Sequence, residues 1–209
     1  MSVISETRGC IDFYTTPGYS PGAQIAIILG ELGLAYRFHE IKPTVKKEDT
    51  PIHHEPNAVL KDIDEAGLAV TFEGASAIMH YLIKQYDSDH KISFPPNSPE
   101  AEQVSTWQPF FKSPTKNPSH SPATKEPGTK GSNTFEILFS LNERLRETED
   151  YLVGHKFSVA DIAHIPVVVT AEDAGVDIEM FPNVVSWYNN ILSRSGVEKG
   201  LAASSSRSF

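Results

Sequence analysis

Cysteine is almost absent from this sequence, with Cys10 as the single thiol in 209 residues. One thiol excludes an intramolecular disulfide and any zinc site built from several cysteines, and Cys10 is interpreted as a packing residue. No apolar run reaches the length needed to span a bilayer, and the first eight residues are too polar for a secretion signal. We therefore expect a cytoplasmic protein without membrane contact.

Positive charge is also scarce. Lysine and arginine number 18 against 27 aspartates and glutamates, which gives a formal net charge of −9. Such a balance disfavours nucleic acid and anionic membranes as partners. The hydrophobic content of 39% is that of an ordinary globular protein, and 209 residues are enough for one large domain or two small ones.

The best-defined local pattern is a helix start at Ser158. Asp161 follows three residues later, and this spacing predicts a capping box in which each residue satisfies the backbone of the other. Residues 159–171 are nearly all apolar, which predicts a buried helix in the middle of a helical domain, with a kink at Pro166 and an end at Gly175. His164 within it is predicted to be a satisfied core residue rather than a ligand.

Strand and helix signals alternate through the first part of the chain. The order predicts a thioredoxin-like βαβ–ββα unit in which parallel strands flank the first helix. Its elements are a strand at 9–14, a helix from Ser20 to Gly33, a strand at 35–41, a loop at 42–57, a hairpin at 58–63 and 68–72, and a helix at 75–86.

Strand signals disappear after residue 99. Helices are predicted at 100–111, 133–151, 159–171 and 184–192, with a Pro/Ser-rich mobile loop at 112–132 and a frayed end at 202–209. The predicted class is therefore α/β followed by all-α. The predicted domains are a thioredoxin-like domain at 1–87, a linker at 88–98 and a helical domain at 99–209.

Two motifs in the second half carry a family resemblance. Residues 151–154 (YLVG) with 158–161 (SVAD), and residues 181–184 (FPNV) with Trp187, make the whole chain resemble the cytosolic glutathione transferases, closest to the fungal, phi/Ure2p-like branch. The resemblance implies that the first domain binds glutathione and the second supplies the wall for a small apolar electrophile. It also implies a homodimer and no metal.

The glutathione-binding motifs depart from the family pattern. The family has a cis-proline where this chain has Leu60 or Lys61, so we expect a trans bond and a reshaped strand edge. The family's Glu-Ser pair falls on Gly74 and Ala75, although Glu73 and Ser76 can restore these contacts by a one-residue shift. The glutathione-binding residues implied by the resemblance are Val59, Leu60, Lys61, Glu73, Gly74 and Ser76.

The hydroxyl that activates the thiol has two candidates. Ser20 stands where serine-type members place theirs, and its alternative role is to cap the helix. Tyr14 ends the first strand, where tyrosine-type members place theirs, and its alternative role is that of a partly buried strand aromatic. The co-substrate wall is assigned to Tyr19, Trp107, Phe110 and Phe111, and for the last three core packing is the alternative. His53 and His54 could meet a glutathione carboxylate or be solvated.

These observations predict an enzyme that adds the glutathione thiolate to an apolar electrophile in secondary-metabolite biosynthesis. One alternative is a glutathione-dependent cis-trans isomerase, because a thiolate that adds reversibly to a conjugated olefin frees the bond to rotate. The other is a non-catalytic binding or scaffold module, since a fold alone does not fix a function. Glutathione binding separates the scaffold from both enzymes.

Overall fold

The structure is a computed structural model that describes residues 11–16, 20–41, 58–63, 67–107 and 130–204. The predicted loop at 42–57, residues 112–129 of the predicted loop at 112–132, and the strand start at Gly9 therefore lie outside the described residues. Residues 130–132, also predicted to be loop, belong to a helix that begins at Lys130. Within the described ranges, no helix combines the length and apolar character needed to cross a membrane.

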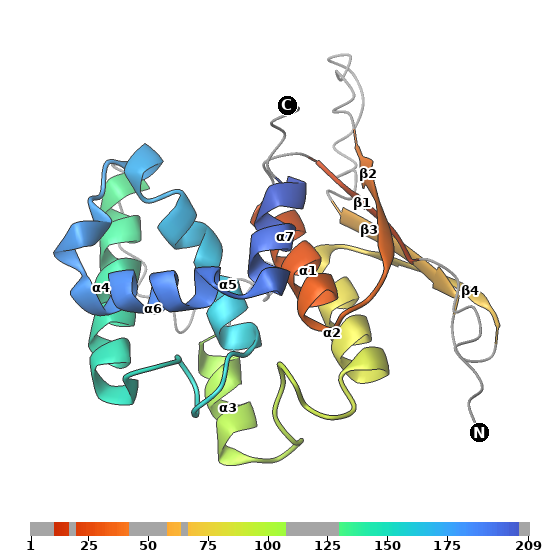
Figure 1. The fold of residues 1–209 in the computed structure, drawn as a ribbon, viewed down its shortest axis with the longest axis horizontal. Helices are drawn as coiled ribbons and strands as arrows, with labels where there is room; N and C mark the ends of the chain where they lie inside the picture. Colours follow the sequence, from red (N-terminus) through yellow and green to blue (C-terminus); the bar gives the residue numbers. More distant parts are fainter. Residues whose placement is uncertain (1–10, 17–19, 42–57, 64–66, 108–129, 205–209) are drawn as a thin grey trace, which may run out of the picture.

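Four short strands form one mixed sheet in the order β2-β1-β3-β4. β1 runs parallel to β2 and antiparallel to β3, and β3 is antiparallel to β4. This arrangement confirms the predicted thioredoxin-like unit, with helix α1 connecting the two parallel strands (Figure 1). The elements are β1 (Ile11–Thr15), α1 (Ser20–Glu31), β2 (Tyr36–Glu40), β3 (Ala58–Ile63), β4 (Ala69–Glu73) and α2 (Ala75–Tyr86).

Helices α1 and α2 cover the same face of this sheet. β1 alternates between buried and half-buried side chains, and its buried Phe13 pairs in register with the buried Leu60 of β3. On the same face the buried Asp62 accepts hydrogen bonds from the hydroxyls of Tyr81 (2.9 Å) and Tyr86, both on α2. Burial and then the Asp62 carboxylate raise the pKa of Tyr81. Apolar contact and this polar cluster together hold α2 on the sheet.

The second half of the chain is helical, as predicted. Figure 1 shows α5 between the sheet-bearing half and the outer pair α4 and α6. Ser98 begins α3 by accepting a hydrogen bond from the amide of Ala101 (3.1 Å), with Pro99 in the first turn. The helices are α3 (Pro99–Thr106), α4 (Lys130–Thr148), α5 (Val159–Val169), α6 (Pro182–Leu192) and α7 (Ser195–Ser204).

The capping box at the start of α5 is confirmed. The Ser158 amide donates to Asp161 Oδ2 (2.9 Å), and the Ser158 hydroxyl oxygen accepts from the Ala160 amide (3.3 Å). The other carboxylate oxygen of Asp161 accepts from the amide of Leu152 (3.0 Å) and the indole of Trp187 (2.9 Å). Burial raises the pKa of this carboxyl, and the hydrogen bonds oppose that shift. One side chain thus ties α5 to the preceding loop and to α6.

The end of α5 differs from the prediction. The helix stops at Val169, and Gly175 instead ends a short 3-10 turn at Glu172–Ala174, with a φ of 75°. Thr170 takes the C-cap position, and its hydroxyl donates to the carbonyl of Pro166 (2.9 Å). The predicted apolar run was therefore longer than the helix, because apolar residues continue into the turn that follows it.

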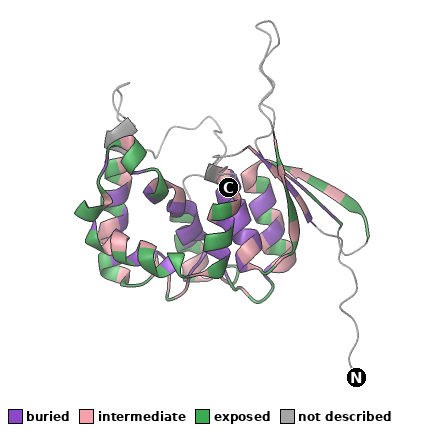
Figure 2. Cartoon of the chain, turned by 45° about the horizontal axis from the view of Figure 1, so that its top comes forward, coloured by how far each residue is buried: buried purple, intermediate pink, exposed green. Residues whose placement is uncertain are grey.

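One correction concerns residues 202–204, the first part of the segment 202–209 that was expected to fray; residues 205–209 lie outside the described residues. The structure has α7 extending to Ser204 and lying against α1 (Figure 1). A Cβ added at Gly200 would lie 2.5 Å from the amide nitrogen of Ile27, and one added at Gly196 would lie 2.7 Å from that of Glu31. Only glycine allows this approach, and Figure 2 shows α1 buried along most of its length.

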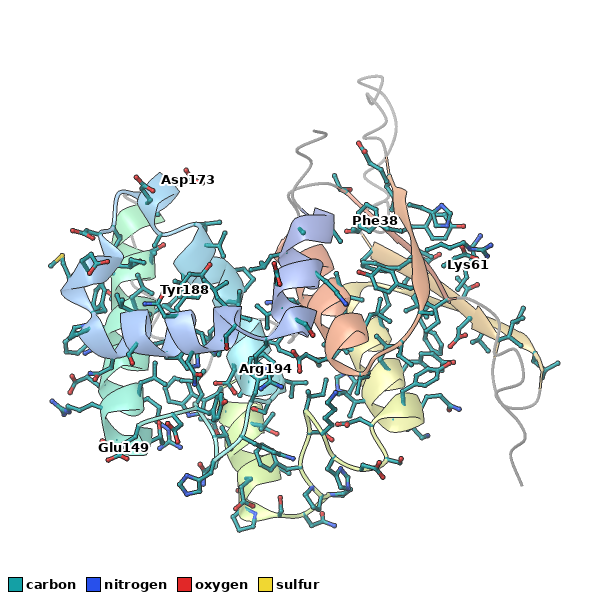
Figure 3. All side chains as sticks on the ribbon, viewed as in Figure 1. Phe38, Lys61, Glu149, Asp173, Tyr188 and Arg194 are labelled. Carbon is teal, nitrogen blue, oxygen red and sulfur yellow. The ribbon has the colours of Figure 1, made fainter. Side chains whose placement is uncertain are left out.

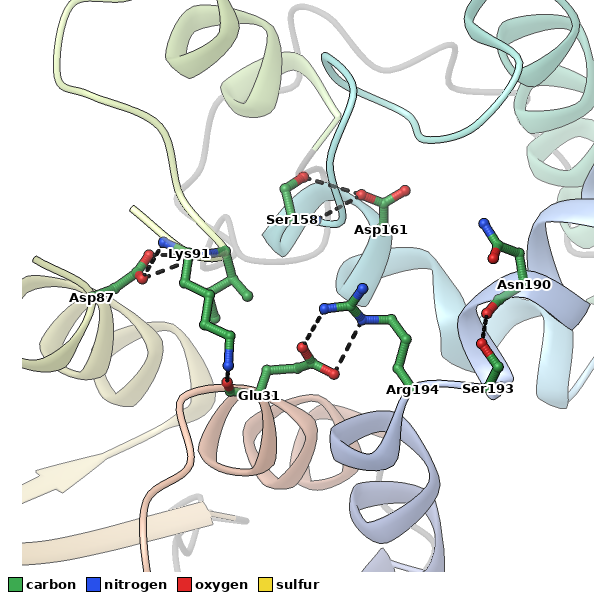
Figure 4. Close-up of polar contacts among 9 residues, drawn as sticks. Glu31, Asp87, Lys91, Ser158, Asp161, Asn190, Ser193 and Arg194 are labelled. Atoms are coloured by element: carbon green, nitrogen blue, oxygen red, sulfur yellow. Dashed lines mark hydrogen bonds and ion pairs between the residues drawn. The ribbon is translucent and has the colours of Figure 1, made fainter. Parts of the chain in front are cut away.

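A polar junction at the last turn of α1 joins the two halves. Arg194 donates to both carboxylate oxygens of the nearly buried Glu31 (2.7 and 3.2 Å), and its guanidinium lies over the ring of Phe157. The ammonium of Lys91, in the segment after α2, donates to the carbonyl of Glu31 (Figure 4). Glu31 therefore receives contacts from the segment that follows α2 and from the residue that precedes α7.

Candidate functional site

Several chain segments meet at the C-terminal end of β1. Thr15, the last residue of β1, pairs with Ala58, the first residue of β3, and its carbonyl accepts from the amide of Ile41 (2.9 Å). The carbonyl of Ala58 accepts from the amide of Gly74 (2.9 Å), the residue that precedes α2. The ends of three strands and the start of α2 are therefore fixed to one another at this corner of the sheet.

The N-terminus of α1 lies at the same corner. Thr15 packs so closely on the first turn that a Cβ at Gly22 would lie 2.3 Å from its hydroxyl oxygen. Ser20 is the first residue of α1, which is where the sequence placed it. Its side chain and the whole of Tyr19 lie outside the described residues. The position of Ser20 at the end of a twelve-residue helix is nevertheless defined, and the positive end of the helix dipole points there.

The start of α2 has no side-chain cap. Gly74 occupies the N-cap with a φ of 85°, a left-handed conformation that favours glycine, and it offers no side chain to the first-turn amides. Ser76 is half-buried in that first turn, and Glu73 ends β4 as an exposed residue. Unoccupied amides at a helix start, next to a serine and a glutamate, can bind the carboxylate and amino group of one small molecule.

Three of the predicted glutathione-binding residues lie in β3. Along Val59, Leu60 and Lys61 the backbone pairs with β1 on one side and with β4 on the other, so it offers no free edge to a ligand. Leu60 is fully buried against the helices, and Lys61 is exposed on the opposite face. No cis peptide bond occurs among the described residues, so the expected trans backbone at Leu60 and Lys61 is present.

Tyr14 lies on the sheet face opposite α1 and α2. Its ring stacks on the imidazole of His39 with 4.4 Å between the centroids. The ammonium of Lys61, which is labelled beside the strands in Figure 3, lies 5.2 Å from the centroid of the Tyr14 ring. On the same face Asp12 accepts from Arg37 (2.7 and 2.8 Å) and pairs with His39 (2.7 Å). These contacts, above all those of Arg37, lower the pKa of Asp12 to about 2. The environment of Tyr14 is that of a packed strand aromatic.

A hydrogen bond connects α1 to α5 behind the site. Gln24, one turn after Ser20, donates to the carbonyl of Ala163 (3.0 Å) from a nearly buried position. The next residue, His164, contacts the ring of Trp107 edge to face at 5.9 Å between centroids. Trp107, which follows α3, is therefore connected to the first turns of α1 through His164 and the hydrogen bond between Ala163 and Gln24. Phe110 and Phe111 lie outside the described residues.

His164 is confirmed as a core residue. Its Nδ1 lies 2.8 Å from the carbonyl of Ala160 in the preceding turn, and burial lowers its pKa. Among the residues that the structure describes, no group of three or more histidine, cysteine, aspartate or glutamate side chains could hold a metal ion. His53, His54 and Cys10 lie outside the described ranges.

Sequence reasoning missed two features of this region, Gln24 and the cover that α7 provides. A glutamine with an otherwise apolar helix around it (Ile25, Ala26, Ile27, Ile28, Leu29) was a signal, because a buried amide needs a partner. The spacing of Gly196 and Gly200, four residues apart, was the corresponding signal for a closely packed helix.

Comparisons with known proteins agree with this geometry. Residues 106–195 match the family model described as glutathione S-transferase, C-terminal domain. The chain is 32% identical to the glutathione S-transferase-like protein tpcF of Aspergillus fumigatus, over 92% of this chain and 95% of that one. It is 29% identical to the glutathione S-transferase-like protein gedE of Aspergillus terreus, over 86% and 89% of the two chains.

The fold is also similar to a solved structure. The glutathione transferase URE2P6 of Phanerochaete chrysosporium, in complex with oxidized glutathione, superimposes with a TM-score of 0.70. The two sequences are 26% identical, and the match covers 95% of this chain and 97% of the other. The similarity therefore extends across both the sheet-bearing half and the helical half.

Proposed function

The chain belongs to the glutathione S-transferase family, in its fungal Ure2p-like branch, and on that premise we propose that it transfers the thiolate of glutathione to an apolar electrophile. The observation that supports this most directly is the uncapped start of α2 at the corner where β1, β3 and α1 also meet. This corner offers donors for an anionic peptide and lies next to the start of a second helix.

Glutathione carries a γ-glutamyl carboxylate that suits the first turn of α2. The amides of this turn and the hydroxyl of Ser76 are the proposed donors to that carboxylate, and Glu73 is the proposed partner of the neighbouring ammonium group. A side chain at position 74 that capped α2 would compete with the carboxylate for the first-turn amides, and Gly74 has no side chain to do so. The one-residue shift from the family motif therefore leaves the chemistry of this subsite intact.

The thiol of glutathione then lies toward the start of α1. A hydroxyl that donates to the sulfur stabilises the thiolate and lowers its pKa, and the positive end of α1 acts in the same direction. Ser20 is the proposed donor, because Tyr14 is held on the opposite sheet face by His39 and Lys61. The attacking species is the thiolate, which forms the new bond to carbon while the leaving group departs with its electron pair.

The helical half supplies the apolar side of the site. Trp107 is the proposed wall residue, since its ring is half-buried and is connected through His164 and Ala163 to Gln24 of α1. Tyr19, Phe110 and Phe111 remain proposed members of the same wall. We place the reaction in a specialised biosynthetic pathway, because the altered glutathione motifs favour a tailored enzyme over a broad one. We also propose that the enzyme is a cytoplasmic homodimer, as the resemblance to the cytosolic glutathione transferases implies.

Isothermal calorimetry with glutathione and with S-methylglutathione tests this proposal. We expect both to bind, because the γ-glutamyl subsite does not depend on the thiol. A conjugation assay with glutathione and 1-chloro-2,4-dinitrobenzene should then show turnover. Absence of binding would favour the scaffold alternative, which the altered Gly74 and Ala75 positions support. Binding without conjugation, together with rotation of a conjugated cis-olefin, would favour the isomerase alternative.

Replacing Ser20 with alanine is expected to slow conjugation 10- to 100-fold, or about 1.4–2.8 kcal/mol, because the thiolate loses its hydroxyl donor. The matched variant Tyr14→Phe should stay within about twofold of the parent, since its ring contacts do not need the hydroxyl. The measurement is kcat/KM at several pH values. A large loss in Tyr14→Phe together with none in Ser20→Ala would reverse the assignment.

A further inference from the structure

A cavity separate from the glutathione corner lies in the helical half. It has a volume of about 630 Å³ and is bounded by the last turn of α5, the chain between α5 and α6, and one turn of α6. Its described lining residues all fall within positions 168–188, so it shares none of them with the corner where β1, α1 and α2 meet. A cavity of this size can enclose a small organic molecule, since ligand sites typically measure about 300–1,000 Å³.

The chain between α5 and α6 forms one wall of the cavity and is held in place by local hydrogen bonds. The amide of the buried Val176 donates to the carbonyl of Ala171 (2.9 Å). A second 3-10 turn, at Ile178–Met180, begins after Asp177, whose carboxylate accepts from the amide of Glu179 (3.0 Å). The wall is therefore preformed, and a ligand does not have to order this segment.

The opposite wall is a tyrosine without a hydrogen bond. Figure 3 shows Tyr188 between α6, on which it lies, and the end of α5. Its ring is half-buried, and its hydroxyl has no hydrogen-bond partner within the described ranges. Burial raises the pKa of this hydroxyl, so it stays uncharged at neutral pH and can accept a hydrogen bond. The rest of the hydrocarbon lining is aliphatic and consists of Val168, Val169, Val176 and Ile178.

The charged side chains among the described lining residues are all acidic. Glu172, Asp177 and Glu179 are exposed, and none of the three forms an ion pair with a residue that the structure describes. One carboxylate oxygen of Asp177 accepts from the 3-10 turn, which leaves the other oxygen for a ligand. An ammonium group among these carboxylates reduces their mutual repulsion and donates charge-assisted hydrogen bonds, whereas an anion is repelled.

We propose that this cavity binds an apolar amine in its protonated form. The hydrocarbon body of the amine lies against Val168, Ile178 and Tyr188, and its ammonium group lies among the three carboxylates. A small inorganic cation would leave the apolar wall uncovered, so an amine with a larger hydrocarbon body binds more tightly. The net charge of −9 attracts the same class of ligand to the whole protein. Because the cavity and the glutathione corner share no described residue, this proposal does not depend on the transferase proposal.

Three fluorescent probes that differ at one end test the proposal. Dansylcadaverine ends in an ammonium group, dansylaminopentanol in a hydroxyl and dansylaminohexanoate in a carboxylate. Titrations at low ionic strength contain saturating S-hexylglutathione, which occupies the glutathione site and its apolar neighbour. We expect the ammonium probe to bind about tenfold more tightly than the hydroxyl probe, and the carboxylate probe to bind more weakly than either.

A double variant tests the role of the carboxylates. Glu172→Gln with Glu179→Gln should remove most of the preference for the ammonium probe and leave the affinity of the hydroxyl probe unchanged. The matched control is Glu102→Gln with Glu198→Gln, which removes two exposed first-turn carboxylates from α3 and α7 and changes the net charge equally. This control should keep the preference within about twofold of the parent.

A further pair of variants tests the location. Val169 is the exposed last residue of α5 and lines the cavity, so Val169→Trp should fill it and weaken the ammonium and hydroxyl probes about tenfold. Leu192→Trp, at the exposed last residue of α6 and outside the lining, should change neither affinity.

Equal affinity of the ammonium and hydroxyl probes for the parent would overturn the proposal, as would an unchanged preference in the variant that lacks Glu172 and Glu179. So would a parent oligomer that Val169→Trp dissociates, because the cavity would then belong to an interface between copies. Calorimetry with glutathione on the same samples reports the transferase proposal separately.

Discussion

Replacing Asp161 with alanine is expected to lower the free energy of unfolding by roughly 4 kcal/mol, because each buried donor left without a partner costs about 1–3 kcal/mol. The carboxylate accepts from the amides of Leu152 and Ser158 and from the indole of Trp187, and it is fully buried. These three donors come from a loop, a helix start and α6, so no single rearrangement can satisfy them all. Urea unfolding followed by circular dichroism measures the loss.

The matched control is Ser158→Ala, which removes one capping oxygen from the same motif. Its cost should be about 1 kcal/mol, as for other N-cap serines. Glutathione affinity should be unchanged in the fraction of Asp161→Ala that remains folded at low temperature, because the carboxylate does not face the ligand corner. If both variants lowered the free energy of unfolding by the same small amount, the Trp187 indole and the Leu152 amide would have to be solvated in Asp161→Ala. The contact between α5 and α6 would then be weaker than the hydrogen-bond distances indicate.

The double variant Gly196→Ala and Gly200→Ala is expected to destabilise the protein by roughly 2–6 kcal/mol, since overpacking costs about 1–3 kcal/mol at each site. The new Cβ atoms would lie 2.7 Å from the Glu31 amide and 2.5 Å from the Ile27 amide. Backbone atoms cannot rotate away, so α7 must move off α1. The sign of the change in unfolding free energy is informative, because replacing glycine with alanine in an exposed helix stabilises a protein by about 0.5–1 kcal/mol.

The control for α7 is Lys199→Ala, at an exposed position between the two glycines. It should change the unfolding free energy by less than about 0.5 kcal/mol. Thermal and urea unfolding of both variants give the comparison. A double variant more stable than the parent would mean that α7 is free to separate from α1 in solution, contrary to the close approach described here.

Much of the fold could be predicted because its signals are local. The capping box of Ser158 and Asp161 depends on two residues three positions apart, and the structure confirms both partners. The order of strands and helices before residue 87 followed from alternation and from helical periodicity, which also require only neighbouring residues. The contacts of Asp161 with Leu152 and Trp187 could not be predicted, since they depend on how separate segments pack.

The features that the sequence did not predict also depend on how separate segments pack. The short segment from Ser195 to Ser204 has six glycine, alanine and serine residues and few large apolar ones, so its helix was not predicted. Its stability comes from α1, which is more than 160 residues earlier in the chain. Leu60 was assigned to glutathione from its place in a motif, and the motif did not show that its backbone pairs with β1 and β4 while its side chain is buried. For the activating hydroxyl, the sequence left Ser20 and Tyr14 open, and the packing of Tyr14 now favours Ser20.

The packing of α7 on α1 has a consequence for protein synthesis. A ribosome makes the β1-α1-β2 segment first, and domains generally begin to fold as they emerge. Here the partner of one α1 face is α7, which lies more than 160 residues later in the chain, so this face stays uncovered until α7 has been made. The carboxylate of Glu31 likewise lacks its Arg194 partner until residue 194 has been made. Until then the nascent chain exposes apolar surface of α1, and surface of this kind is what chaperones protect.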